Sequence, residues 1–217
     1  MQQIRLLTAN LWNGRADPLA LADVIAERQP DAVLAQELSP EQAAVIERAL
    51  PHGILMPARD MQGMGIALRE PAMVSRLPLP KRDALCARLR LPGASTEIEI
   101  MNLHLSAPTA LGRFGVRRRE VSALRAHLRR TSMPRVLAGD FNTLPVMPAY
   151  FALRRHLRDA ALETRRRPAP TWGPTARAPR LLRIDHVMVH GLRVIDLEVL
   201  AIAGSDHSAI FATLALP

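Results

Sequence analysis

Lysine, cysteine and aromatic residues are scarce in this chain, and long apolar runs are missing. Lys81 is the sole lysine among 29 Lys and Arg residues, Cys86 is the sole cysteine, and aromatic residues make up 3% of the 217 positions. A single cysteine excludes an internal disulfide, and the sequence has no Cys/His cluster typical of a structural zinc site. No segment approaches the roughly 20 apolar residues of a membrane-spanning helix. The few aromatic side chains are poor material for stacking unpaired bases.

The opening stretch, MQQIRLLTANLWNG, has no long apolar segment followed by a small-residue cleavage site. We therefore expect no signal peptide. Together with the lone cysteine, this predicts a cytoplasmic location, where thiols stay reduced.

Arginine is the residue in excess, and it gives a formal net charge of +9 and a sequence pI of about 11.3. A strongly basic chain attracts polyanions such as nucleic acid or an acidic membrane surface. A bias in genome composition would produce the same preference for arginine over lysine. We therefore expect loose attraction to phosphate backbones, with nucleic acid as a possible partner, rather than sequence-selective binding. The sequence leaves the oligomeric state open.

Apolar runs and turn residues predict an α+β protein. Strands are expected at 4–10, 32–36, 53–57, 63–69, 72–76, 83–91, 96–105, 136–138, 184–189, 194–201 and 207–216, and helices at 17–28, 39–50, 111–130 and 148–157. This mixture predicts sheets packed on each other with helices outside, and a purely parallel doubly wound fold fits less well. Only about 35 residues follow the Pro- and Arg-rich loop 165–183, too few for a separate domain, so we expect one domain over residues 1–217.

Polar side chains stand at the ends of the apolar strands or inside one of them. They are Asn10, Glu37, Asn102, His104, Asp140, Asn142, Asp185, Asp206 and His207. At one position a turn would explain them, because Gly, Asp and Asn are turn formers. Their presence at so many strand ends predicts a site at one edge of a sandwich.

The chemistry of this set favours a hard metal ion. It contains four carboxylates, at least two histidines and several amides, but no thiol. Such oxygen ligands suit Mg²⁺, which is usually held by one or two carboxylates plus a substrate phosphate, whereas zinc would require more histidine or cysteine. A histidine beside a carboxylate can act as a general base. The set therefore predicts metal-assisted hydrolysis of a phosphate ester by water.

Six motifs in order along the chain resemble those of the endonuclease/exonuclease/phosphatase superfamily. They are TANLW, AQE, NLHLSAP, GDFN, RIDHV and GSDH, and they extend from residue 8 to residue 207. The superfamily includes DNase I, AP endonucleases, neutral sphingomyelinases and inositol polyphosphate 5-phosphatases. The resemblance implies a four-layer α/β sandwich, with two mixed sheets face to face and helices outside, and a Mg²⁺-dependent hydrolase in which Mn²⁺ is also possible.

The resemblance also implies a role for each metal-side and base residue. Glu37 would be the main Mg²⁺ ligand, with Asn10 beside it. Asp206 would complete the metal side or bind a second ion. His207 would be the general base, or would position the attacking water, and Asp185 would orient it.

The remaining residues would handle the substrate. Asp140 and Asn142 would act on the nucleophile and the scissile phosphate, and His104 would donate a hydrogen bond to a phosphate oxygen or serve the leaving group. We expect Asn102 to contact substrate. From the Arg-rich loop, we expect the same of Arg183, with Arg177 and Arg180 as alternatives.

Two positions bear on the branch of the superfamily. AP endonucleases usually have a tyrosine where this chain has His104, and often an acidic residue where it has Trp12. Both differences disfavour the AP-endonuclease branch.

Three hypotheses for the function remain: a phosphoesterase acting on a small or lipid-derived phosphodiester or phosphomonoester, a nonspecific nuclease of the same fold, and a non-catalytic binding module. The third is disfavoured because every matched catalytic position is intact.

Other conspicuous residues are expected to be structural or solvated. We expect Trp12 and Trp172 to pack in the core or in loops, His186 to be structural and His127 to be solvated. Arginines 117–119 and 165–167 are expected to form solvated faces.

Overall fold

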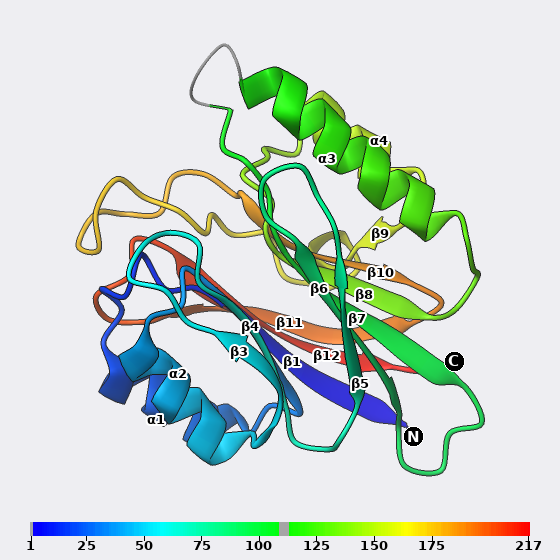
Figure 1. The fold of residues 1–217 in the computed structure, drawn as a ribbon, viewed down its shortest axis with the longest axis horizontal. Coiled ribbons are helices and arrows are strands. Elements are labelled where there is room, and N and C mark those ends of the chain that lie inside the picture. The colour runs from blue at the N-terminus through cyan, green and yellow to red at the C-terminus, as the bar shows by residue number, and fades with distance from the viewer. Residues whose placement is uncertain (1, 109–112) are drawn as a thin grey trace.

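Two six-stranded β-sheets pack face to face between helices in the computed structural model, which describes residues 2–108 and 113–217 (Figure 1). Sheet A has the strand order β11-β12-β1-β2-β4-β3, and sheet B has the order β5-β6-β7-β8-β10-β9. Sheet A contains β1 (Gln3–Asn10), β2 (Ala32–Gln36), β3 (His52–Met56), β4 (Met64–Leu68), β11 (Arg193–Ala201) and β12 (Ser208–Ala215). Sheet B contains β5 (Met73–Leu77), β6 (Ala84–Arg90), β7 (Glu97–His104), β8 (Arg135–Asp140), β9 (Arg158–Asp159) and β10 (Asp185–His190).

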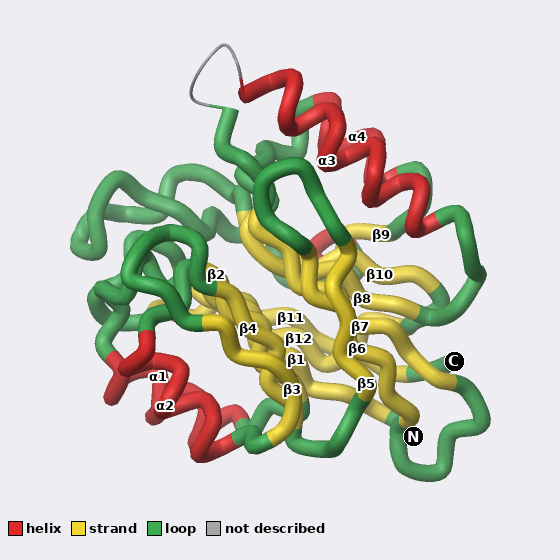
Figure 2. The backbone as a smooth tube through the Cα atoms, in the orientation of Figure 1, coloured by secondary structure: helices red, strands yellow, loops and turns green. Residues whose placement is uncertain are grey.

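The helices cover the outer faces of the two sheets. They are α1 (Pro18–Arg28), α2 (Pro40–Ala49), α3 (Arg113–Leu128) and α4 (Pro148–Arg154), with a 3₁₀ turn η1 (Ala160–Leu162) beside β10. Figure 2 shows α1 and α2 outside sheet A and α3 and α4 outside sheet B. The layers are therefore helix, sheet, sheet, helix.

Both faces of the central strands are buried, which explains their continuous apolar runs. Ile4 of β1 and Leu34 of β2 belong to the core between the sheets, together with Val136 of β8. The alternate residues, such as Leu7 and Val33, pack with α1 and α2 instead. The period-two alternation of a strand thus supplies two cores at once.

Capping residues in the sequence fix where the first two helices begin. Asp17 accepts a hydrogen bond from the backbone N–H of Leu19 (2.9 Å), and Pro18 occupies the first turn. Ser39 and Gln42 form a reciprocal capping box at α2. Helix α2 begins at Pro40, four positions after Gln36 ends β2, so only a short connection separates the strand from the cap.

The predicted sandwich and most element boundaries are confirmed, with a few local differences. Strand β9 was not predicted, because its two residues carry no period of their own. Helix α3 is described from Arg113 to Leu128. The predicted start of this helix at Leu111 and Gly112 lies outside the described residues. Among the described residues, no helix has the length and apolar character needed to cross a membrane.

Candidate active site

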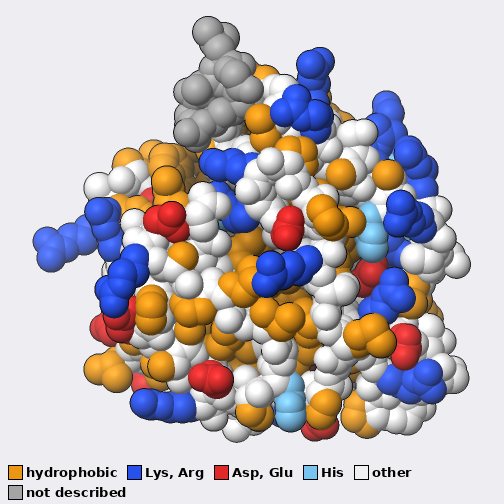
Figure 3. All heavy atoms as spheres, in the orientation of Figure 1, with side chains coloured by type: hydrophobic (Ala, Val, Ile, Leu, Met, Phe, Trp, Pro, Cys, Tyr) orange, Lys and Arg blue, Asp and Glu red, His pale blue; other side chains and the backbone are white. Residues whose placement is uncertain are grey.

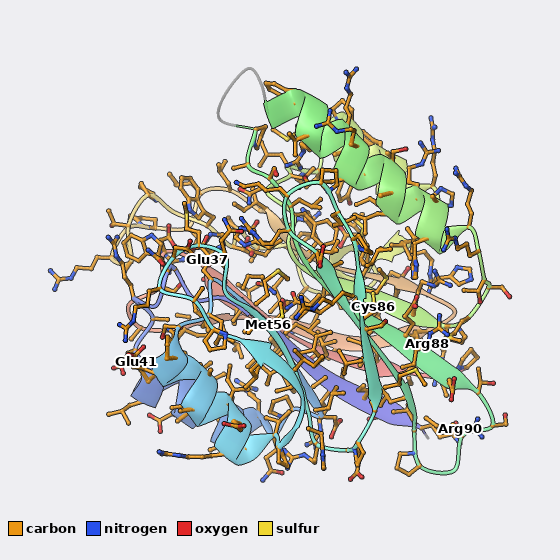
Figure 4. All side chains as sticks on the ribbon, viewed as in Figure 1. Glu37, Glu41, Met56, Cys86, Arg88 and Arg90 are labelled. Carbon is orange, nitrogen blue, oxygen red and sulfur yellow. The ribbon has the colours of Figure 1, made fainter. Side chains whose placement is uncertain are left out.

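Two parallel strand pairs, one in each sheet, end at the same edge of the sandwich. In sheet A, Asn10 ends β1 and Glu37 follows the parallel strand β2. In sheet B, His104 of β7 is the register partner of Asp140 at the end of the parallel strand β8. Strand β10 runs antiparallel to β8, so its first residue, Asp185, also pairs with Asp140. Figure 4 labels Glu37 at this edge, among the loops.

Asn10 links the two sheets at this edge. Its Nδ2 donates to Glu37 Oε1 (3.2 Å) within sheet A and to Asp140 Oδ2 (3.1 Å) in sheet B, while its Oδ1 accepts from the backbone N–H of Trp12 (2.9 Å). His104 Nε2 lies 3.7 Å from Glu37 Oε1 and 3.5 Å from Asp140 Oδ2. Side chains from four strands thus meet within one small volume.

Left-handed backbone conformations gather at the site. Glu37 (φ 53°), Asn142 (φ 47°), Trp12 (φ 48°) and Asn13 (φ 50°) all have positive φ. Asn adopts this conformation readily, but a residue such as Glu37 pays about 1–2 kcal/mol for it. Such strain persists where surrounding contacts enforce it, and it is typical of functional sites.

The GDFN segment owes its shape to its glycine. Gly139 has φ 137°, and a Cβ there would lie 2.0 Å from the carbonyl oxygen of Leu103. The close approach of β7 and β8 therefore requires glycine. Beyond it, Asp140 Oδ1 accepts from the backbone N–H of Asn142 (2.7 Å), and Asn142 Nδ2 donates to Asp140 Oδ2 (3.0 Å) and to Leu105 O (3.0 Å). The segment therefore forms a hydrogen-bonded turn, and the same turn places Asp140 and Asn142 at the cavity.

His207 and Asp185 form a buried pair. His207 Nδ1 lies 2.9 Å from Asp185 Oδ2 and 3.1 Å from Oδ1. The backbone N–H groups on each side are held by hydroxyls: His207 N–H donates to Ser205 Oγ (3.0 Å) and Asp185 N–H to Thr171 Oγ1 (3.2 Å). Because a carboxylate only accepts, the proton of the neutral ring is on Nδ1, and Nε2 is left for another partner.

The electrostatics of the site are dominated by carboxylates. Burial opposes the charged form of His207, but the carboxylates of Asp185, Asp140 and Asp206 outweigh it and raise the pKa of His207 to about 9. Burial and the charge of Asp185 raise the pKa of Asp140 to about 7. Burial also raises the pKa values of Glu37 and Asp206. The carboxylates share a desolvated space that favours binding of a cation.

His104 differs from His207 because it lacks a carboxylate in hydrogen-bond contact. Burial lowers the pKa of His104 well below its usual value, and the positive charge of Arg82 lowers it further. The ring is therefore neutral at pH 7. Its Nδ1 is buried without a hydrogen-bond partner.

The donor atoms at this edge fit a hard divalent cation. Ligand atoms of Asp140, Asp185 and His207 lie within 4.8 Å of one another, although His207 Nδ1 is already committed to Asp185. On the other side of the site, Asp206 Oδ1 is buried and has no hydrogen-bond partner, while its Oδ2 accepts from Trp172 Nε1 (3.1 Å). A buried anionic oxygen without a partner is costly, and a bound cation would satisfy it.

The converging side chains line a cavity of about 420 Å³. Of the predicted site residues, the lining contains Glu37, His104, Asp140, Asn142, Asp206 and His207. Two basic residues of the lining, Lys81 and Arg82, were missed. Arg82 Nη1 donates to the backbone oxygen of His104 (3.4 Å) and its Nε to Gln62 Oε1 (3.1 Å). Both precede β6 in a loop, and nothing in their sequence context marked them as site residues.

Trp12 and Trp172 lie in loops, one of the two expected settings, and both also line the cavity. The guanidinium carbon of Arg15 lies over the ring of Trp12, 4.5 Å from the ring centroid. The indole of Trp172 holds Asp206, and its backbone bridges to His207.

The structure contradicts the expected substrate contact of Asn102. Its side chain is completely buried between the sheets. Its Nδ2 donates to the carbonyl oxygens of Ala35 (2.9 Å) and Gly65 (2.8 Å), and its Oδ1 accepts from Gln36 Nε2 (2.6 Å). All of these bonds join β7 to sheet A. Asn102 therefore connects the sheets and has no donor left for a substrate.

The expected substrate contact of Arg183 is also wrong. Its Nη2 donates to Asp159 Oδ2 (2.7 Å), and its Nη1 lies 3.2 Å from His186 Nδ1. Arg183 is absent from the cavity lining, as are its alternatives, Arg177 and Arg180. Arg180 instead binds backbone oxygens of its own loop and of the segment before β12. The arginine in the cavity is Arg82.

Arg117 and His127 were expected to be solvated, but Arg117 is buried and His127 is partly buried. Arg117 donates to the backbone oxygens of Ser106 (2.6 Å) and Phe141 (2.8 Å) and so ties α3 to the floor of the site. His127 lies 3.1 Å from Glu99. His186 is completely buried, as expected.

Comparison with known proteins identifies the family of this chain and solved structures that share its fold. The model of the Endonuclease/Exonuclease/phosphatase family matches residues 7–207. Among curated protein sequences, none matches this chain significantly.

Many solved structures share the fold at low sequence identity. An endonuclease/exonuclease/phosphatase from Beutenbergia cavernae is 21% identical with a TM-score of 0.76, covering 100% of this chain and 72% of that one. A mannosyl-6-phosphatase from Bacteroides thetaiotaomicron is 17% identical with a TM-score of 0.79, covering 98% and 100%. The human Nocturnin catalytic domain is 17% identical with a TM-score of 0.71, covering 100% and 95%. Since the family model spans nearly the whole chain, this chain belongs to the endonuclease/exonuclease/phosphatase family, whose members are hydrolases of phosphate esters.

Proposed function

We propose that this chain is a divalent-metal-dependent phosphoesterase that hydrolyses a phosphodiester or a phosphomonoester with water activated by His207 and Asp185. The observation that carries the proposal is the 2.9 Å contact between His207 Nδ1 and Asp185 Oδ2 at the wall of a carboxylate-lined cavity. A cation bound among the carboxylates would offset the negative charge that raises the pKa of His207 and so favour the neutral ring. In that form the contact fixes the tautomer and leaves Nε2 to accept a proton from water. Asp185 then stabilises the imidazolium that forms.

The other residues would bind and orient the phosphate. Glu37, Asn10 and Asp206 would hold Mg²⁺, or Mn²⁺ in its place. When bound, such an ion supplies positive charge against the phosphate oxygens. The neutral His104 would donate a hydrogen bond to a phosphate oxygen or to the leaving group.

Asp140 and Asn142 would complete the floor of the site. Asp140 Oδ2 accepts from Asn10 and Asn142, so its carboxylate is fixed at the point where the attacking water and the scissile phosphate would meet. The positive charges of Lys81 and Arg82 at the cavity wall would attract a phosphate group and offset its repulsion by the carboxylates.

A nonspecific nuclease of the same fold is the alternative. It is favoured by the basic surface, whereas the likeness to a mannosyl-6-phosphatase favours a small phosphomonoester. A non-catalytic module is disfavoured because the matched residues lie together around one cavity. A cytoplasmic location, suggested by the single cysteine, stays part of the proposal.

The test compares substrates of different size under the same conditions. A chromogenic phosphomonoester, a chromogenic phosphodiester and supercoiled plasmid are each offered with Mg²⁺, with Mn²⁺ and with EDTA, at low and at higher salt. A small-substrate enzyme hydrolyses a chromogenic ester, stops in EDTA and changes little with salt. A nuclease nicks the plasmid and loses rate steeply with salt, because phosphate contacts release counterions. Hydrolysis that continues in EDTA would refute the metal-dependent proposal.

A further inference from the structure

Two hollows lie between α3, α4 and the segments that flank them. The apolar hollow has a volume of about 630 Å³, and its walls include Phe114, Val121, Met147, Pro148, Ala149 and Ala152. The basic hollow has a volume of about 310 Å³, and its walls include Arg129, Arg155, His156 and His190. The apolar hollow shares Pro108 and Met147 with the catalytic cavity, so this face adjoins the mouth of the candidate active site.

Large apolar side chains are exposed beside the apolar hollow. Phe114 is 53% exposed, Phe151 is 55% exposed and Val146 is 77% exposed. The chain has only four phenylalanines, so two of the four stand in solvent on this one face. A cluster of exposed apolar groups next to a hollow marks a binding surface rather than ordinary surface variation.

The same face carries arginines without acidic partners. Helices α3 and α4 contain one carboxylate, Glu120, which is buried and accepts from Ser106 Oγ (2.8 Å). Among the described residues, Arg118, Arg129 and Arg155 have no carboxylate oxygen within 4.0 Å. Figure 3 shows basic side chains gathered along α3 at the upper right. This positive charge is available to an external anion.

We propose that the α3–α4 face docks on the surface of an anionic lipid bilayer. Exposed apolar groups with a basic surround are the composition that binds the interface between lipid headgroups and acyl chains. The apolar hollow has a size and lining suited to an acyl chain, and the arginines suit headgroup phosphates. Single-stranded nucleic acid fits less well, because Phe114 is the one aromatic residue in the lining of the hollow and successive bases need several stacking platforms. This docking does not depend on the chemistry proposed for the catalytic cavity.

The test measures binding of the full chain to vesicles of phosphatidylcholine with and without phosphatidylglycerol, by co-sedimentation. The face variant is Arg118→Gln/Arg129→Gln/Arg155→Gln, and the matched control is Arg48→Gln/Arg76→Gln/Arg90→Gln, which removes the same charge from other surfaces. At about 1 kcal/mol per arginine, the face variant should lower the partition coefficient on the order of 10²-fold. The control variant should stay within a few fold of the wild type, since its arginines do not meet the bilayer. Phe114→Ala/Phe151→Ala, which keeps every charge, should lower binding about tenfold.

Thermal unfolding of each variant checks that it is folded, which matters most for Phe151→Ala because it removes a ring contact with the buried Tyr150. Binding that requires phosphatidylglycerol and is lost in the face variant but not in the control supports the proposal. No binding to the anionic vesicles, or equal loss in both triple variants, overturns it. Loss of single-stranded DNA binding in the face variant, with vesicle binding unchanged, also overturns it and assigns the face to nucleic acid.

Discussion

Replacing Asn102 by alanine tests whether this residue connects the sheets or binds substrate. The substitution removes both donors to the carbonyl oxygens of Ala35 and Gly65 and the acceptor for Gln36 Nε2. All three partners are buried, and each buried polar group left without a partner costs about 1–3 kcal/mol. Allowing for partial relaxation, we expect Asn102→Ala to lower the free energy of unfolding by about 3 kcal/mol. That is a large part of the roughly 5–15 kcal/mol that stabilises a typical domain.

Urea unfolding followed by tryptophan fluorescence measures this loss, and a double-mutant cycle with Gln36→Leu isolates the bond between the two side chains. We expect a coupling energy of about 1–2 kcal/mol for this pair. The KM of the folded Asn102→Ala protein should equal that of the wild type, because the residue lies outside the cavity lining. An unchanged urea midpoint together with a raised KM would refute the structural role and restore the substrate contact.

Three further predictions concern stability and positioning. Burial and the charge of Arg183 lower the pKa of His186 to about 4. The stability that depends on a neutral His186 is therefore fully present above pH 6.5 and is lost as the pH falls toward 4. Equilibrium unfolding should show about 3 kcal/mol of stability lost in that window, and His186→Gln should flatten the profile. Gly139→Ala should cost about 3 kcal/mol or more in urea unfolding, because its Cβ would meet the Leu103 carbonyl at 2.0 Å; a wild-type midpoint would contradict this. Trp172→Phe, which keeps an aromatic ring but removes the Nε1 donor to Asp206, should weaken Mn²⁺ binding by about tenfold in calorimetry and leave the unfolding midpoint unchanged.

The sequence predicted the sandwich, and it marked residues that the structure brings together at one edge, because both follow from local rules. Apolar runs of strand length, broken by Pro and Gly, mark the strands, and polar residues at their ends mark the edge where parallel pairs terminate. Asp140, Asp185 and His207 stand at such ends, and the structure brings them together. The order of the motifs added what periodicity alone does not contain.

The errors arose where the same chemistry serves two purposes. Asn102 lies in a motif beside His104, and only the packing of β7 against sheet A decides that its amide points into the core. Arg183 lies in an arginine-rich loop, and its partner Asp159 stands 24 positions earlier in a two-residue strand that no period marks. Pairings this distant depend on the assembled fold and leave no local signal.

The basic residues that do face the cavity were missed for a related reason. Arg82 comes from the loop before β6, far from any matched motif, and it reaches the site only because β6 lies beside β7. Arg117 appeared to belong to a solvated helical face, but its guanidinium turns inward to the carbonyl oxygens of Ser106 and Phe141. Helix periodicity gives the side from which an arginine leaves the backbone, whereas its long side chain decides where the charge lies.

The most direct test of the central claim is the rate of phosphate-ester hydrolysis by wild type and by His207→Ala, with Mg²⁺ and with EDTA, on whichever substrate the wild type turns over fastest. Loss of the group that accepts the water proton should lower kcat at least about 10²-fold, with little change in KM. Asp185→Asn should lower kcat in the same direction, because the ring loses the carboxylate that orients it. A folded His207→Ala protein with the kcat of the wild type would contradict the account, since the water would then be activated without His207.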